Sequence, residues 1–261
     1  MPFAQSFDGT ALWYELHDGG SGAESLLLIA GNGCDHQMWN HVIHDFTPER
    51  SVIIYDHRGT GKSGDNFSTG WSTRDFARDA YAILKDANIK RAHVYGHSMG
   101  GRVAQWFAAD HPEMTSALIL GASSVGDRKG IPRPAEATAA MEKNDFVSLQ
   151  AMCFPDEWLR EHPQEAASGA PNPHNNEAFL CHLLASNEHD SWEIAASIMS
   201  PTLIIHGSED SMTHPANSDM LAARIPSSQL LIIEKGRHVY WAGHLEAHMA
   251  VKSFLEKTEG K

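Results

Sequence analysis

The sequence predicts an α/β fold: a mostly parallel β-sheet flanked by helices, with a helical cap inserted into it. Three observations lead to this prediction. Short apolar runs alternate with segments of helical periodicity, the length of 261 residues suffices for one large domain, and 42% of the residues are hydrophobic while 20% are charged. Alternating strands and helices are typical of parallel sheets covered on both faces, and the composition is that of a globular protein.

Six short apolar runs are the candidate strands. They span residues 26–30, 51–55, 92–95, 117–120, 202–206 and 230–233. Each run is nearly unbroken, which is expected of a central parallel strand that is buried on both faces. Because helical segments separate several of them, we expect right-handed crossover connections.

Three segments have the spacing of helices. The first begins at Ser72, where Asp75 three residues later forms a variant of the capping box, and apolar residues then recur at helical intervals. The second spans residues 99–110 and the third spans residues 245–256, which closes the chain. These helices are predicted to cover the sheet.

The segment 123–200 interrupts the alternation. It lacks strand-like runs and contains half of the 12 prolines in the chain. We expect a helical cap over the carboxyl ends of the strands, where open α/β sheets bind their ligands; the alternative is a surface excursion without function. The predicted organisation is a core of residues 1–122 and 201–261 with a cap of residues 123–200.

Charge and cysteine content exclude several classes of protein. Lysine and arginine number 20 against 33 acidic residues, for a formal net charge of -13, and this balance argues against nucleic acid as a partner. No apolar run approaches the roughly 20 residues of a membrane span, and the first residues lack the features of a signal peptide. We therefore expect a cytoplasmic protein. Three widely spaced cysteines predict neither a disulfide framework nor a zinc ribbon.

The sequence Gly96-His97-Ser98-Met99-Gly100 follows one predicted strand and opens a predicted helix. This is the G-x-S-x-G pattern in the context that the pattern requires. The turn from strand to helix is so tight that only glycine fits two residues on either side of the serine. Ser98 is therefore the candidate nucleophile, and the Met99 N–H at the start of the helix is a candidate oxyanion donor.

A serine hydroxyl needs a base, and the base needs an orienting carboxylate. Asp210 lies just beyond the predicted strand 202–206, and His238 lies just beyond the predicted strand 230–233. Their positions at strand ends select them as the acid and the base. Glu209 competes with Asp210 for the acid, and Asp127 is a weaker substitute.

The second oxyanion donor is expected in the loop after the first predicted strand. The Asn32 N–H is the first choice, and the N–H of Gly33 is the alternative. Four large apolar residues are candidates for the wall of a substrate pocket, with core packing as the alternative for each. They are Trp39, Phe154, Trp158 and Trp192.

The sequence predicts no metal site and no cofactor. His41 and His44, or His244 and His248, would share a helical face, but neither pair implies a third ligand. The segment Gly61-Lys62-Ser63 resembles the end of a phosphate-binding loop, but Asp56 occupies the position of the first glycine.

Together these motifs resemble the α/β-hydrolase superfamily, with its chain order of serine, aspartate and histidine. The segment Asp56-His57-Arg58-Gly59-Thr60-Gly61-Lys62-Ser63 matches the D-x-R-G-x-G-x-S turn of that superfamily. Within it, residues 33–39 and 98–106 look most like the 3-oxoadipate enol-lactonase group. The cap segment 154–158 is similar to that group and to the aminoacrylate hydrolases. One departure is Ala30-Gly31, where many members have His-Gly.

The resemblance implies a cofactor-free serine hydrolase that cleaves a small carboxylic ester or lactone through an acyl-enzyme on Ser98. The partner is then a small-molecule substrate, with neither nucleic acid nor a membrane involved. Alternatives are hydrolysis of a C–N or C–C bond by the same triad, perhydrolysis, and a slow-turnover ligand receptor on the same fold. Arg102, four residues after Ser98, is expected on the solvated side of its helix.

Overall fold

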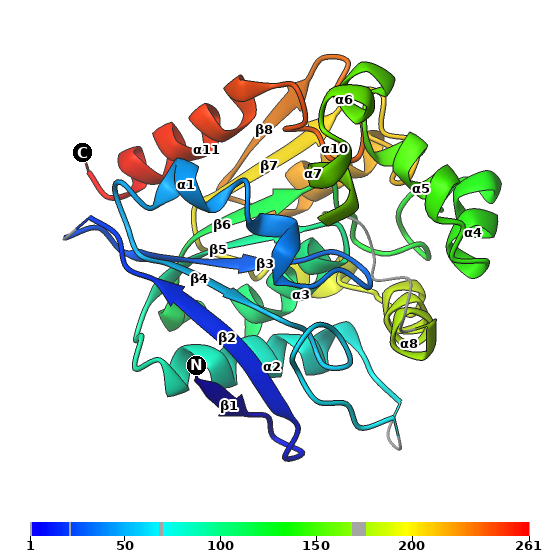
Figure 1. Ribbon diagram of the computed structural model, residues 1–261. Helices are drawn as coiled ribbons and strands as arrows, with labels where there is room; N and C mark the ends of the chain where they lie inside the picture. Colours follow the sequence, from blue (N-terminus) through cyan, green and yellow to red (C-terminus); the bar gives the residue numbers. More distant parts are fainter. Residues whose placement is uncertain (1, 21, 68–69, 169–175, 261) are drawn as a thin grey trace.

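The structure, a computed structural model, describes residues 2–20, 22–67, 70–168 and 176–260. Its centre is one eight-stranded sheet with helices on both faces (Figure 1). The strands are β1 (Phe3–Gln5), β2 (Ala11–His17), β3 (Ser25–Ile29), β4 (Val52–Tyr55), β5 (Ala92–His97), β6 (Thr115–Gly121), β7 (Thr202–Gly207) and β8 (Ser228–Ile233). The predicted fold class is confirmed.

The sheet has the order β1-β2-β4-β3-β5-β6-β7-β8. The pairs β1–β2 and β2–β4 are antiparallel, and every later pair is parallel. All six predicted strands are present. The two antiparallel strands at the amino terminus were not predicted, because β1 is only three residues long and Glu15 interrupts the apolar pattern of β2.

The prediction that every strand is buried on both faces is wrong for β8. This strand lies at the edge of the sheet, and most of its residues are partly or fully exposed. An edge strand has a neighbour on one side only, so apolar composition alone does not distinguish it from a central strand.

The predicted helices are present as α2 (Thr73–Asp86), α3 (Met99–Asp110) and α11 (Leu245–Thr258). Ser72 caps α2 through the expected capping box, in which its side chain and that of Asp75 each accept from the other residue's backbone N–H. Four shorter helices complete the core: η1 (His36–Trp39), α1 (Ile43–Phe46), η2 (Pro112–Met114) and α10 (Ala216–Arg224).

Between β6 and β7 the chain forms α4 (Ala135–Glu142), α5 (Phe146–Cys153), α6 (Asp156–Glu161), α7 (Pro163–Ser168), α8 (Asn176–Asn187) and α9 (Trp192–Ala195). In Figure 1, α4 to α8 lie at the end of the sheet toward which the parallel strands point. The last helix packs differently, because Ala195 and Ile198 belong to the core under the sheet. The division of the chain at residues 123 and 200 stays a prediction.

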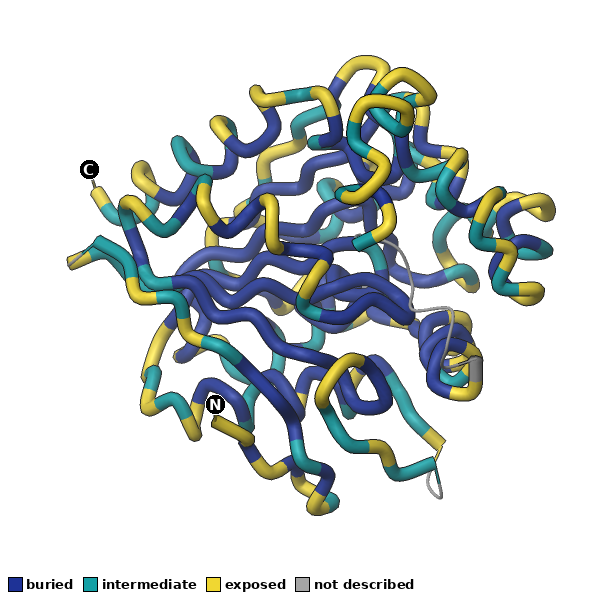
Figure 2. The backbone as a smooth tube through the Cα atoms, in the orientation of Figure 1, coloured by how far each residue is buried: buried dark blue, intermediate teal, exposed yellow. Residues whose placement is uncertain are grey.

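The core consists of two apolar layers, one on each face of the sheet. One layer joins the sheet to α2, α3 and α10, and the other joins it to η1, α1 and α11. Figure 2 shows the central strands as an almost continuous buried band. No helix in the described part of the chain is both long and apolar enough to cross a membrane.

Candidate active site

Ser98 sits at the sharp turn between β5 and α3. Its backbone has φ 58°, a left-handed conformation that is strained for a residue with a side chain. The turn depends on its glycines: a Cβ on Gly96 would lie 2.1 Å from the carbonyl oxygen of Gly100, and one on Gly100 would lie 2.1 Å from that of Ile29. The strand, the turn and the helix can therefore meet at Ser98 only if these positions are glycine.

The structure brings Ser98, His238 and Asp210 together although 140 residues separate the first two. Ser98 Oγ lies 2.9 Å from His238 Nε2, and His238 Nδ1 lies 2.8 Å from Asp210 Oδ2. His238 and Asp210 are both buried. The competing acid Glu209 is exposed, and Asp127 is ion-paired with Arg102. The three side chains thus form one hydrogen-bonded relay from carboxylate to hydroxyl.

Asp210 is held as a carboxylate by four donors. The backbone N–H groups of Met212 and Thr213 donate to its Oδ1 at 2.7 and 2.9 Å, and two histidines donate to its Oδ2. Burial by itself raises the pKa of Asp210, but the charge of His238 and the hydrogen bonds of both histidines outweigh burial, so the pKa lies well below its ordinary value.

The second of these histidines, His206 on β7, was not singled out by the sequence analysis. Its Nε2 lies 2.9 Å from both Asp210 Oδ2 and the carbonyl oxygen of Thr213, so this nitrogen carries the hydrogen. Its Nδ1 lies 2.6 Å from Ser218 Oγ. A polar residue inside an apolar strand, four positions before the acid, was the signal in the sequence.

His97 adjoins the candidate nucleophile, and its ring packs on that of the candidate base His238. The ring centroids of His97 and His238 lie 4.9 Å apart, and His97 Nε2 lies 2.9 Å from the carbonyl oxygen of His238. Burial, followed by repulsion from His238, lowers the pKa of His97 to about 3. His97 is therefore neutral and supports the base by packing.

Two backbone N–H groups are available to an oxyanion. Those of Met99 and Asn32 donate to no acceptor among the described residues, and both residues line a recess that also contains Ser98. The N–H of Gly33, the alternative donor, already donates to His182 Nδ1 at 3.2 Å. His182, on α8, donates in turn from Nε2 to the carbonyl oxygen of Arg58 at 2.9 Å, so it holds this loop in place.

A cavity of about 50 Å³ opens at Ser98 and is mostly apolar. Its walls come from the core and from α4 and α5 of the predicted cap, and include Cys34, Met38, Met141, Leu149, Cys153, Phe154 and Val239. Of the four residues predicted to line the pocket, Phe154 lies in this wall. Trp39 is fully buried in the core, and Trp192 packs on the core beside Arg224; neither lines the cavity.

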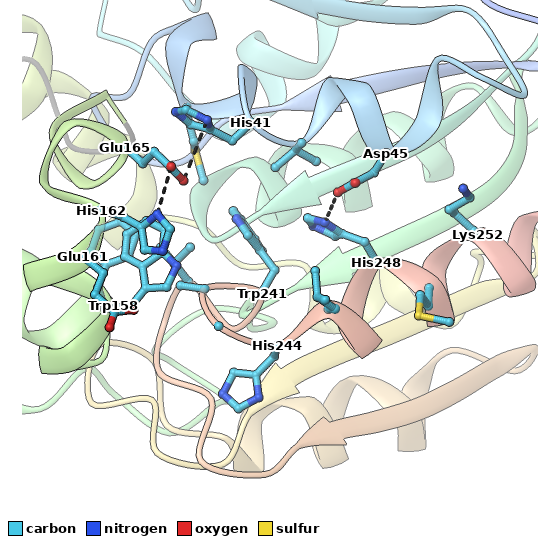
Figure 3. A pocket seen from close by; sticks show the side chains of 18 residues that line it. His41, Asp45, Trp158, Glu161, His162, Glu165, Trp241, His244, His248 and Lys252 are labelled. Carbon is cyan, nitrogen blue, oxygen red and sulfur yellow. Dashed lines mark hydrogen bonds and ion pairs between the residues drawn. The ribbon is translucent and has the colours of Figure 1, made fainter.

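The fourth, Trp158, lies in an outer groove of about 640 Å³ shown in Figure 3. Met38, Phe154 and Val239 line both this groove and the cavity at Ser98, so these side chains form the wall between them. On one side of the groove Glu165 contacts His162 at 3.0 Å and His41 at 3.8 Å.

A small polar recess next to the apolar cavity is also lined by Ser98 and contains Arg102 and Arg133. The expectation that Arg102 lies on the solvated side of α3 is wrong. Its guanidinium is buried and donates to Ser124 Oγ at 2.8 Å, to Asp127 Oδ1 at 3.1 Å and to the carbonyl oxygen of Ser186. The cap supplies Ser186, and the sequence of α3 alone does not show that the cap covers this face.

The candidate metal ligands do not assemble. His248 pairs with Asp45 at 2.7 Å and His244 with Glu246 at 3.2 Å. Another group, Asp35, His36 and Asp56, does bring potential ligand atoms within 4.8 Å of one another. Its carboxylates already accept hydrogen bonds from the chain, at 2.7 Å from the backbone and the ring of His36 and at 2.8 Å from the N–H of Gln37, so internal donors account for the cluster.

A strand-borne serine elbow, a histidine and a buried carboxylate define the site, and comparison with known proteins agrees with it. Residues 23–242 match the family described as serine aminopeptidase, S33. The chain belongs to this family of α/β-hydrolases. The predicted resemblance to the α/β-hydrolase superfamily is therefore confirmed, and the protein is a hydrolase.

The relatives of this hydrolase are named for several different activities. It is 28% identical over 251 residues, 93% of each chain, to the RutD protein of Azorhizobium caulinodans, provisionally named a carbamate hydrolase. A hydrolase from Pseudomonas aeruginosa has 25% identity and a TM-score of 0.83 over 97% of each chain. The enol-lactonase from Burkholderia xenovorans, with 23% identity, a TM-score of 0.84 and coverage of 97% and 99% of the two chains, shares the fold.

Proposed function

We propose that this protein is a serine hydrolase that cleaves a small carboxylic ester or lactone through an acyl-enzyme on Ser98. The observation that carries the proposal is the relay of 2.9 Å from Ser98 Oγ to His238 Nε2 and 2.8 Å from His238 Nδ1 to Asp210 Oδ2. These distances are within hydrogen-bond reach, which nucleophilic catalysis by a serine requires.

In this mechanism His238 takes the proton from Ser98 as the hydroxyl oxygen attacks the carbonyl carbon of the substrate. Asp210 accepts the hydrogen bond from His238 Nδ1, which leaves Nε2 free to act as the base and stabilises the imidazolium. The tetrahedral oxyanion accepts from the N–H groups of Met99 and Asn32. His238 protonates the leaving group, and water then attacks the acyl-enzyme with His238 again as the base.

The apolar cavity favours a small acyl or alcohol group beside the nucleophile. Cys34 and Cys153 in its wall do not compete as nucleophiles, because burial raises the pKa of both thiols, that of Cys34 to about 12. They act as apolar wall residues.

Hydrolysis of a C–N bond is the second candidate, and the relatives provisionally named carbamate hydrolases favour it. The same relay serves both reactions, since His238 can protonate a nitrogen as well as an oxygen leaving group. The bond cleaved is a property of the cavity rather than of the triad.

Acid release measured in a pH-stat across small esters, lactones, amides and carbamates tests the proposal. We expect the highest kcat/KM on an ester or lactone, and we expect Ser98→Ala to abolish the activity. Turnover by Ser98→Ala equal to that of the wild type would rule out Ser98 as the nucleophile. A preference for carbamates would favour the second candidate, hydrolysis of a C–N bond. Tight binding without turnover would favour a slow-turnover ligand receptor.

A further inference from the structure

Arg133 is the one arginine of the polar recess whose donors are mostly uncommitted. It lies between β6 and α4, half-buried, and lines the recess together with Ser98 and Met99. Its guanidinium makes one hydrogen bond to the described part of the chain, from Nη1 to Asn187 Oδ1 at 3.1 Å. Within that part no carboxylate oxygen lies within 4.0 Å of it. A guanidinium has five N–H donors, so most of them are open to a ligand.

Its neighbour Arg102 differs in this respect. Both terminal nitrogens of Arg102 donate to the protein: Nη1 donates to the Ser186 carbonyl and hydroxyl, and Nη2 donates to Ser124 and Asp127. Arg102 therefore fixes the recess, and Arg133 is the side chain left to recognise a ligand.

The local charge also favours an anion. Arg102 and Arg133 are close enough to repel one another, and Asp127, the one carboxylate among the described residues that attracts both, is already ion-paired with Arg102 at 3.1 Å. The recess therefore carries about one uncompensated positive charge in a chain with a formal net charge of -13. Desolvated cations are stabilised when an anion pairs with them.

We propose that Arg133 binds a carboxylate of the substrate, so that the preferred substrate is an anionic ester or lactone rather than a neutral one. This inference rests on the proposed function and adds a substrate class to it. The carboxylate lies in the polar recess and the apolar part of the substrate lies in the neighbouring cavity, which shares Ser98 with the recess. A guanidinium can hold a carboxylate through two parallel N–H···O hydrogen bonds.

The test compares two substrates that differ only in charge. The monomethyl esters of succinate, glutarate and adipate each carry a carboxylate, and the corresponding methyl ester amides are neutral and nearly isosteric. We expect wild-type kcat/KM to favour at least one acid over its amide by about tenfold or more, as charge-assisted hydrogen bonds allow.

Three variants test whether Arg133 causes the preference for the acid. Arg133→Gln removes the charge and should bring the ratio close to one by lowering kcat/KM on the acid only. Arg133→Lys keeps the charge without the planar fork and should retain part of the preference. Arg128→Gln is the matched control, because Arg128 lies nearby in the chain but is exposed and pairs with Glu188 at 3.7 Å; its ratio should equal that of the wild type.

A binding measurement makes the outcome independent of turnover. Calorimetry on Ser98→Ala should give a lower Kd for the acid than for the amide, and adding Arg133→Gln should remove that difference. Equal treatment of acid and amide by the wild type, or a preference that survives Arg133→Gln, overturns the proposal. Binding through Arg133 without hydrolysis of any ester would instead refute the proposed function alone, whereas hydrolysis without charge preference would refute only the carboxylate site.

Discussion

At the scale of single residues, the site depends on how Asp210 is held. Its Oδ2 accepts from both His238 and His206, and only the hydrogen bond to His238 belongs to the relay. His206 is fully buried and hydrogen-bonded at both ring nitrogens, so it fixes the position and rotation of the carboxylate. We regard His206 as a positioning residue that acts through Asp210.

Replacing His206 by alanine should therefore lower kcat and leave KM unchanged. A hydrogen bond to a charged group contributes about 1.5–3 kcal/mol, which corresponds to a loss of about 10- to 100-fold in rate. His206→Gln, whose side-chain nitrogen reaches about where Nε2 lies, should recover part of the rate. Steady-state kinetics on the best ester, with thermal unfolding as a check on folding, measures this.

The same variants can also contradict the positioning role of His206. If the loss of kcat in His206→Ala only matched the fraction of protein that had unfolded, the residue would be structural only. Glu209→Gln serves as the control, because Glu209 is exposed and adjacent to the acid but outside the relay.

At the scale of elements, the turn between β5 and α3 joins the strand to the candidate nucleophile and to a candidate oxyanion donor. The same turn that exposes Ser98 Oγ aims the N–H of Met99 at the recess, because Met99 is the first residue of α3. One backbone segment therefore carries both the candidate nucleophile and the candidate oxyanion donor.

Helix α2 shows how local sequence stabilises an element that covers the sheet. Ser72 and Asp75 exchange hydrogen bonds at its start, both 3.1 Å long. Ser72→Ala should lower the free energy of unfolding by about 1 kcal/mol, the usual value of an N-cap. Urea unfolding measures it. The control Ser197→Ala, at an exposed serine that caps no N-terminus, should change it by less than about 0.5 kcal/mol; equal effects of both variants would contradict the capping role.

At the scale of the whole molecule, buried histidines link stability to pH. His57 and His97 have pKa values lowered to about 3, that of His182 is lowered to about 4, and that of His189 lies well below its ordinary value, in each case mainly because of burial. These side chains stay neutral in the folded protein, while the unfolded chain binds a proton on each of them below about pH 6.5.

The free energy of unfolding should therefore fall as the pH decreases from about 6.5 toward 4. Each such histidine contributes about 1.4 kcal/mol per pH unit over this range, because the unfolded state binds the extra proton. Urea unfolding at pH 7.5, 6.5 and 5.5 should show little change over the first step and a marked loss over the second. His189→Gln should reduce that loss relative to the wild type; a stability that stays constant down to pH 5 would contradict the expectation.

Much of the fold and of the candidate site could be predicted from the sequence because the relevant signals are local. Apolar runs fix strand positions, the capping box fixes the start of α2, and the glycines around Ser98 are needed by a turn that only neighbouring residues build. The candidate triad followed from strand ends, since parallel strands deliver their following loops to one edge of the sheet.

Only the tertiary structure determined the features that depend on contacts between distant parts of the chain. It buried Arg102 under residues of the predicted cap, left Arg133 without a carboxylate partner among the described residues, packed His97 edge-on against His238, and placed Trp39 and Trp192 outside the cavity. It also joined His206 to Asp210. The physical reason is that burial, charge pairing and pocket walls arise from residues distant in sequence, whose contacts no local periodicity encodes.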